Sequence, residues 1–294
     1  MEKQTKSKII FIISMVIFGT IALFVKKINV SSGELALYRA ILATIIIGLY
    51  LIITKQKICL KEAKKDLILI IISGMVMGFN WIFLFEAYKY TTVSISTLAY
   101  YFAPIIVMIV CPILLKEKLT KKQIICFIIS TVGLVLIIGV GDLSVSNSHT
   151  IGVLFGLSAA VFYSIVIIIN KYIKSISGIH RTFIQFIAAI LVLIPYVLFT
   201  SGITLKALNM NGWICLLIVG IIHTGITYCA YFSSLKNLKG QTVALLSYID
   251  PFVAVLISFM MNEIMTIYQI IGGVLIIFGT ILNEIKFKNI KCLK

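Results

Sequence analysis

Ten apolar runs follow one another along the chain, and short polar segments separate them. Each run is roughly 20 residues long, which is enough for a helix to cross a hydrocarbon core about 30 Å thick. The short connections leave no room for an inserted soluble domain. We therefore expect an all-α integral membrane protein with ten transmembrane helices. The runs cover residues 8–25, 33–54, 67–87, 91–115, 123–140, 150–170, 182–200, 211–233, 240–261 and 266–285.

The first run has lysines ahead of it, as the hydrophobic region of a signal peptide does. However, the stretch that ends at Val25 lacks an A-x-A-like cleavage site, and Lys26 and Lys27 follow it. We therefore interpret this run as the first spanning helix rather than as a cleaved signal sequence.

One sequence unit occurs twice. Each copy has an aromatic-rich stretch, a proline within an apolar run, and a glutamate that closes the run. The copies occupy residues 100–123, with Pro104 and Glu117, and residues 247–269, with Pro251 and Glu263.

The two copies belong to two halves with five apolar runs each. An odd number of spans places the second half in the membrane in the opposite orientation, and inverted repeats are typical of secondary transporters. The polar segment 141–150 is the natural boundary. We predict two inverted five-helix repeats, at residues 8–140 and 150–285.

The formal net charge of +16 reflects lysines that gather on alternate connections. If the N-terminus lies inside, all but five of the 26 lysines and arginines fall in inside segments. This distribution follows the positive-inside rule and predicts cytoplasmic termini. We therefore expect lipid, and no nucleic acid, as the partner of the basic charge.

The prolines and one acid are costly inside a membrane. Pro104 and Pro251 each free a backbone carbonyl, which neighbours or cavity water must satisfy. Two such breaks at matching depth in inverted copies would meet near the midplane, where substrate sites form. Asp250 lies about ten residues into the ninth run. Burying its charge costs at least about 2.5 kcal/mol, so we expect it to bind substrate or a proton, or to hydrogen-bond the broken helix.

These features resemble the EamA-type, ten-helix members of the drug/metabolite transporter superfamily. The resemblance lies in the doubled unit, in Asp250 directly before Pro251, in Arg39 early in the second run, and in the glycine-dotted fifth and tenth runs. It covers residues 8–285. The second half lacks an arginine that answers Arg39, because Arg181 falls three residues earlier. The resemblance implies export of amino acids or related metabolites, with possible coupling to protons.

Further candidate residues lie in the runs that this family uses to line its cavity. Asn80 and His223 are too deep for an interfacial role, so they need polar partners or cavity water. Several of the aromatic residues have anchoring at the membrane interface as an alternative role. The candidate substrate-binding residues are Asn80, Trp81, Tyr101, Pro104, His223, Thr227, Tyr228, Ser247, Tyr248, Asp250 and Pro251.

Four other charged residues have gating or structural roles as candidates. We expect Glu117 and Glu263 to cap the next helix or to pair with lysines such as Lys118 and Lys121. Arg39 lies near water at the outer end of its helix, where it could guide an anionic group. Glu86 is either a gate residue or one that snorkels to the surface.

No catalytic or metal-binding pattern is present in the sequence. The three histidines and six cysteines lack zinc-ligand spacing, and no phosphate loop occurs. We therefore expect no enzyme, no cofactor and no metal, and a protein of the cytoplasmic membrane that binds a small-molecule substrate as a monomer or homodimer.

The predicted function is secondary transport of a small metabolite by alternating access. One alternative is an importer or exchanger of another solute, such as a cation, a sugar or a nucleoside. A channel or a non-transporting scaffold is a further alternative, although a channel should show a charged ring or a filter sequence.

Overall fold

The computed structural model describes residues 2–25, 27–56, 64–91, 93–138, 147–176, 178–203, 208–260 and 266–284. All regular elements in these ranges are helices. They are α1 (Glu2–Gly19), α2 (Ala22–Val25), α3 (Ser32–Ile53), α5 (Leu67–Tyr90), α6 (Val93–Tyr100), α7 (Ala103–Leu115), α8 (Lys121–Ile138), α9 (Asn147–Tyr172), α10 (Gly178–Thr200), α11 (Met210–Ile218), the π-helix η2 (Val219–Ile226), α12 (Thr227–Leu235), α13 (Gly240–Leu246), α14 (Ile249–Met260) and α15 (Ile267–Glu284).

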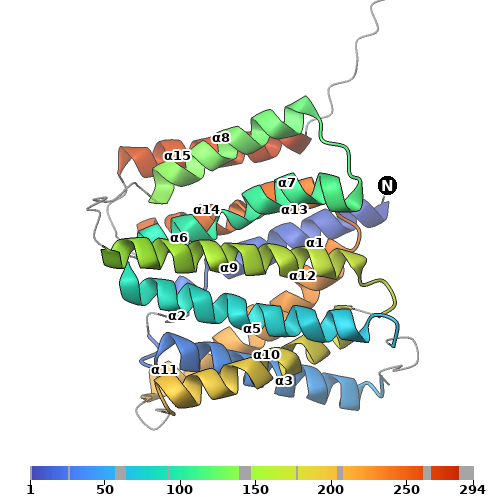
Figure 1. Ribbon diagram of the computed structural model, residues 1–294, viewed down its shortest axis with the longest axis vertical. Coiled ribbons are helices and arrows are strands. Elements are labelled where there is room, and N and C mark those ends of the chain that lie inside the picture. Colours follow the sequence, from blue (N-terminus) through green and yellow to red (C-terminus); the bar gives the residue numbers. More distant parts are fainter. Residues whose placement is uncertain are drawn as a thin grey trace, which may run out of the picture.

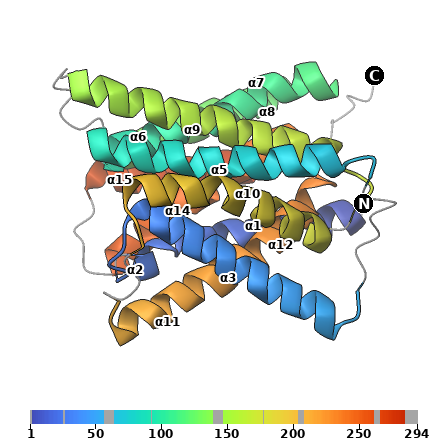
Figure 2. The same ribbon diagram turned by 60° about the horizontal axis from the view of Figure 1, so that its bottom comes forward.

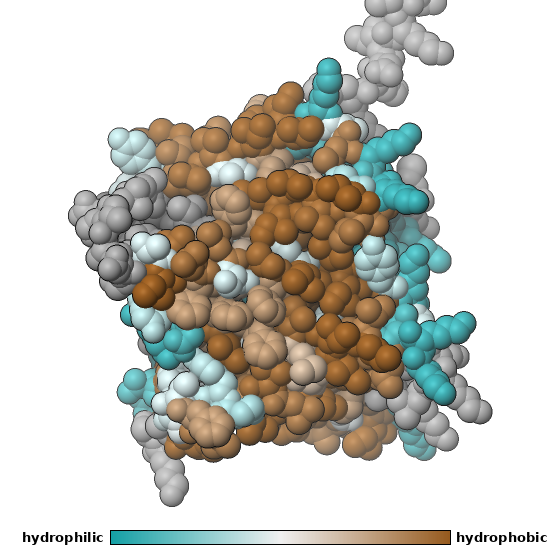
Figure 3. All heavy atoms as spheres, in the orientation of Figure 1, coloured by the Kyte–Doolittle hydropathy of each residue, from teal (hydrophilic) through white to brown (hydrophobic). Residues whose placement is uncertain are grey.

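The helices run side by side along one common direction, so that their ends gather at two faces of the bundle (Figures 1 and 2). Figure 3 shows a broad apolar belt between these faces, with most hydrophilic side chains along the edge where α1 begins. We call that edge the lysine-rich end, because Lys55, Lys116, Lys171 and Lys239 follow or end helices there. An apolar belt of this kind suits a hydrocarbon environment.

Six described helical segments are long and apolar enough to cross a membrane, and Ala103–Leu115 and Ile270–Asn283 are shorter apolar helices. Several of the ten predicted runs are divided into consecutive shorter helices. The run at 91–115, for example, comprises α6 and α7. The protein is therefore a multi-pass, all-helical membrane protein whose spans are partly discontinuous.

The two predicted proline breaks lie at equivalent places. Helix α6 ends one residue before Tyr101, and Pro104 lies in the first turn of α7. Likewise α13 ends before Ser247, and Pro251 lies in the first turn of α14. Proline lacks an N–H group and has a fixed φ, so it suits the start of a new helical segment. Pro112 and Pro195, by contrast, lie inside α7 and α10.

Two further irregularities have no proline. The first span is interrupted between α1 and α2 at Thr20 and Ile21, and the π-helix η2 joins α11 to α12. Short π-helical segments occur frequently at functional sites. The sequence pattern predicted neither feature.

Polar side chains connect the helices at the lysine-rich end. The Asp66 carboxylate accepts hydrogen bonds from the backbone N–H groups of Lys174 and Ser175 and from the Ser175 hydroxyl. Burial alone would raise the pKa of Asp66, but these hydrogen bonds lower it below its usual value. Arg181 lies inside α10, not ahead of it as predicted, and donates to the backbone carbonyls of Asn170 and Phe232. These contacts join the ends of α9 and α12 to neighbouring helices.

Small residues allow the helices to approach closely. A Cβ atom on Gly74 of α5 would lie 2.3 Å from the Gln185 carbonyl oxygen and 2.8 Å from the Ala188 Cβ of α10. Gly152 and Gly156 of α9 meet Thr91 and Ala99 at similar distances. The contact of α5 with α10, and the contacts of α9 with α6 and with the residue that follows α5, therefore depend on the absence of side chains at these glycines.

We predict that Gly74→Ala destabilises the protein by about 1–3 kcal/mol, because backbone atoms of α10 would have to move. Gly225→Ala is the matched control, since the nearest atom to a Cβ there lies 3.5 Å away. Thermal unfolding of the detergent-solubilised protein measures both. Equal melting temperatures for the two variants would contradict the close α5–α10 contact.

Candidate functional site

The two helix breaks meet at one hydrogen bond. Tyr101, in the break between α6 and α7, donates its hydroxyl to Oδ2 of Asp250 at 3.0 Å. Asp250 lies in the first turn of α14, where the free N–H groups and the helix dipole favour a negative charge. No basic side chain pairs with Asp250 in the part of the chain that the structure describes. The interaction therefore joins the two halves through one acid and one phenol.

A small cavity adjoins Asp250. Its volume is about 30 Å³, which is roughly the share of one water molecule in the liquid. A metabolite does not fit there in this conformation. The cavity is lined by Met15, Tyr100, Tyr101, Ala103, Pro104, Tyr163, Ser247 and Asp250.

Arg39 is a charged residue beside this central region. Its guanidinium lies 4.3 Å from the ring centroid of Trp81, and its buried Nε has no hydrogen-bond partner among the described residues. We expected Arg39 near water. Its side chain is partly exposed, and its guanidinium lies over the buried ring of Trp81. Tyr88, Tyr100 and Tyr228 are close enough to interact electrostatically with both Arg39 and Asp250. A region rich in tyrosine thus lies between one positive and one negative group.

Aromatic rings surround this region. The Tyr228 ring lies 5.0 Å from Phe18 and 6.2 Å from Trp81, in both cases edge to face. The hydroxyl groups of Tyr163 and Tyr231 are 2.9 Å apart. Such ring pairs stabilise packing and also present faces to cations and apolar groups.

His223 and Thr227 belong to the irregular part of the eighth run. His223 Nε2 lies 3.0 Å from the Thr20 hydroxyl, at the break between α1 and α2. The Thr227 hydroxyl donates to the Ile222 carbonyl, which also accepts a hydrogen bond from the Thr227 backbone N–H. The irregularities of the first and eighth runs therefore meet, as the two proline breaks do.

Four other candidates are buried, and two of them contact neighbouring helices. Asn80 is 1% exposed and donates to the Ala159 carbonyl of α9 at 2.7 Å. The Tyr248 hydroxyl lies 2.8 Å from that of Thr131 in α8. Ser247 donates to the Val243 carbonyl and also lines the small cavity, whereas Pro251 is buried beside Asp250.

Glu117 closes the lysine-rich end of the bundle. One carboxylate oxygen accepts a hydrogen bond from Lys171 Nζ at 2.9 Å, and the other accepts from the Gly240 N–H at 2.7 Å, at the start of α13. Lys171 also donates to the Leu238 carbonyl. We call these contacts the Glu117–Lys171 latch. We expected Glu117 to cap the next helix or to pair with lysines such as Lys118 and Lys121. It pairs with a lysine, Lys171 of another helix, whereas Thr120 and Gln123 cap the next helix.

The remaining glutamates lie elsewhere. Glu86 accepts hydrogen bonds from Lys89 and from the Tyr196 hydroxyl, at the end opposite the latch. Glu263 lies outside the described residues. The structure therefore brings Tyr101, Pro104, Ser247, Asp250 and Pro251 together, with Arg39, Trp81 and Tyr228 across the tyrosine-rich region.

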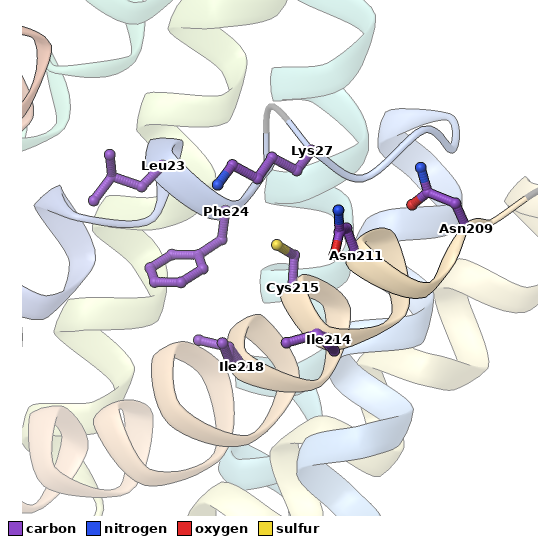
Figure 4. A pocket seen from close by; sticks show the side chains of 8 residues that line it. All are labelled: Leu23, Phe24, Lys27, Asn209, Asn211, Ile214, Cys215 and Ile218. Carbon is purple, nitrogen blue, oxygen red and sulfur yellow. The ribbon is translucent and has the colours of Figure 1, made fainter. Parts of the chain in front are cut away.

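Larger spaces lie at the end opposite the latch. One pocket of about 770 Å³ lies between α2 and α11 (Figure 4), and another of about 340 Å³ lies beside Tyr88 and Tyr196. Neither was predicted from the sequence. Lys27, Thr20, Tyr163 and Lys171 were also missed, because a helix break and a helix-end ion pair leave no local signal in sequence.

Comparisons with known proteins agree with this arrangement. The model of the EamA-like transporter family matches the chain twice, at residues 5–139 and 150–284. The uncharacterized transporter YxxF of Bacillus subtilis is 31% identical, covering 97% of this chain and 92% of its own. An uncharacterized transporter of Archaeoglobus fulgidus is 25% identical, covering 92% and 93%. A crystal structure with a TM-score of 0.81 and 16% identity covers 96% of this chain and 98% of its own, and shows the same fold.

We predict that Glu117→Gln and Lys171→Met each destabilise the protein by about 3–5 kcal/mol, because each leaves a buried charge without its partner. Only 7% of the Lys171 side chain and 15% of the Glu117 side chain are exposed. The double variant should lose less than the sum of the single losses. Thermal unfolding of the four proteins measures the coupling.

The control is Glu86→Gln, because Glu86 pairs with Lys89, whose side chain is 55% exposed. That change should cost at most about 1 kcal/mol through the ion pair. Strictly additive losses at Glu117 and Lys171 would refute the latch.

Proposed function

Because the chain belongs to the EamA-like transporter family, and is therefore a membrane transporter and not an enzyme, we propose that it moves a small metabolite by alternating access. Its energy would come from a solute or proton gradient. The observation that carries this proposal is the meeting of two broken helices at Asp250 and Tyr101. Discontinuous helices that meet from two halves of a transporter are typical of substrate and coupling-ion sites.

The proposal includes a membrane topology. We propose ten spans arranged as two inverted repeats, at residues 8–140 and 150–285, with both termini in the cytoplasm. The distribution of lysines supports this orientation. The latch would then close the cytoplasmic end, and the larger pockets would open to the outside. This state corresponds to the outward-open member of an alternating-access cycle in the cytoplasmic membrane.

The proposed substrate class comes from Arg39 and Asp250, the two charged residues beside the tyrosine-rich region. Arg39 suits a carboxylate, Asp250 suits an ammonium group, and the tyrosine and tryptophan rings between them suit an apolar body. We therefore propose amino acids or related amphipathic metabolites as substrates. Export is the proposed direction, with Asp250 as the group that carries the coupled proton.

The transporter mechanism predicts counterflow. In liposomes, a radiolabelled amino acid chosen from a thermal-shift panel should enter saturably, and unlabelled substrate inside should accelerate its entry. Liposomes without protein provide the background. A flux that rises linearly with concentration, without counterflow, would instead indicate a channel.

A second prediction concerns Asp250. Asp250→Asn keeps an acceptor for Tyr101 but cannot release a proton. We expect the variant to lose accumulation driven by a pH gradient and to retain counterflow. Asp66→Asn is the matched control, because Asp66 lies in a connection away from the breaks. Unchanged pH dependence in Asp250→Asn would show that Asp250 is structural.

A further inference from the structure

The pocket between α2 and α11 has the size of a metabolite site. Its volume of about 770 Å³ lies within the range of roughly 300–1,000 Å³ that is common for small-molecule pockets. Figure 4 shows that the side chains of Phe24 and Lys27 form one wall, and those of Asn211 and Cys215 form the facing wall.

The walls combine one positive charge with apolar surface. Phe24, Ile214 and Ile218 supply the apolar part, whereas the Lys27 ammonium and the Asn211 amide supply hydrogen-bond donors. No acidic side chain is among the residues that line the pocket. This chemistry suits a molecule that has an anionic group and an apolar body.

Lys27 can bind a ligand carboxylate. Its side chain is exposed, lines the pocket and forms no ion pair with another described residue. Lys171 shows the same chemistry at the opposite end of the bundle, where it binds the Glu117 carboxylate and a backbone carbonyl.

Direct contacts lead from the pocket to the helix breaks. The Phe24 ring lies 5.2 Å from that of His223, which hydrogen-bonds Thr20. Gly19, which directly precedes Thr20, packs closely on α14. A Cβ atom added at Gly19 would lie 2.7 Å from the Asp250 carbonyl oxygen. A ligand bound in the pocket can therefore affect Asp250 through a short series of direct contacts.

We propose that this pocket is an outer binding site for small amphipathic carboxylates, with Lys27 as the residue that recognises the carboxylate. This proposal rests on the proposed transport function, and it adds a second binding site between the central region and the outside. The ligand places its carboxylate at Lys27 and Asn211 and its apolar body against Phe24, Ile214 and Ile218.

The test is equilibrium binding to the full-length protein in phosphatidylcholine nanodiscs. The probe is 3-phenylpropionate, and 3-phenyl-1-propanol is its uncharged analogue. We expect the carboxylate to bind at least about tenfold more tightly than the alcohol, because a charge-assisted hydrogen bond is lost in the alcohol. Lys27→Gln should remove this preference, and Asn211→Leu should weaken binding of the carboxylate.

Lys89→Gln is the matched control, since Lys89 lies at the same end but pairs with Glu86, and it should bind like the parent. Asp250→Asn should also bind the probe. Loss of transport in the assay can then be distinguished from loss of probe binding at the pocket. Equal binding of alcohol and carboxylate, or unchanged binding in Lys27→Gln, would overturn the proposal. So would displacement of the probe by phosphatidylglycerol in the nanodisc, because the pocket would then hold a lipid headgroup.

Discussion

The arrangement of the bundle depends on how it accommodates Asp250. A carboxyl group in an apolar interior needs hydrogen-bond donors. A continuous helix offers none, because its backbone N–H groups already donate to its own carbonyl groups. The break before α14 supplies free N–H groups and the positive end of a helix dipole, and the break before α7 supplies the Tyr101 hydroxyl. Both breaks are required, and they must lie at the same depth. The depth of the break at Pro104 is therefore tied to the depth of the break at Pro251.

The breaks also divide the bundle into two ends with different properties. At the lysine-rich end the Glu117–Lys171 latch joins the ends of α7 and α9 to the start of α13. At the other end, Lys27 and Tyr88 line open pockets. The two ends of the bundle therefore differ within one conformation. In a protein with inverted repeats, exchanging these environments produces the opposite-facing state.

The sequence allowed much of this arrangement to be predicted, and physical reasons explain the rest. The proline breaks and the depth of Asp250 follow from local chemistry, so they could be predicted from single positions. The partner of Glu117 could not, because Lys171 lies on another helix and meets it only after packing. The inward turn of Arg39 depends on the position of Trp81, and the π-helix η2 has no residue that marks it. Side chains whose roles depend on a partner from another helix were the ones missed.

The latch end and the pocket end should open alternately around the two breaks. Pulsed electron paramagnetic resonance tests this, with nitroxide pairs at exposed positions 118 and 236 across the latch end and at 90 and 210 across the pocket end. In the latch-free double variant, distances across the latch end should lengthen while those across the pocket end shorten. Lengthening of the distances at both ends, or no change at either end, would contradict alternating opening.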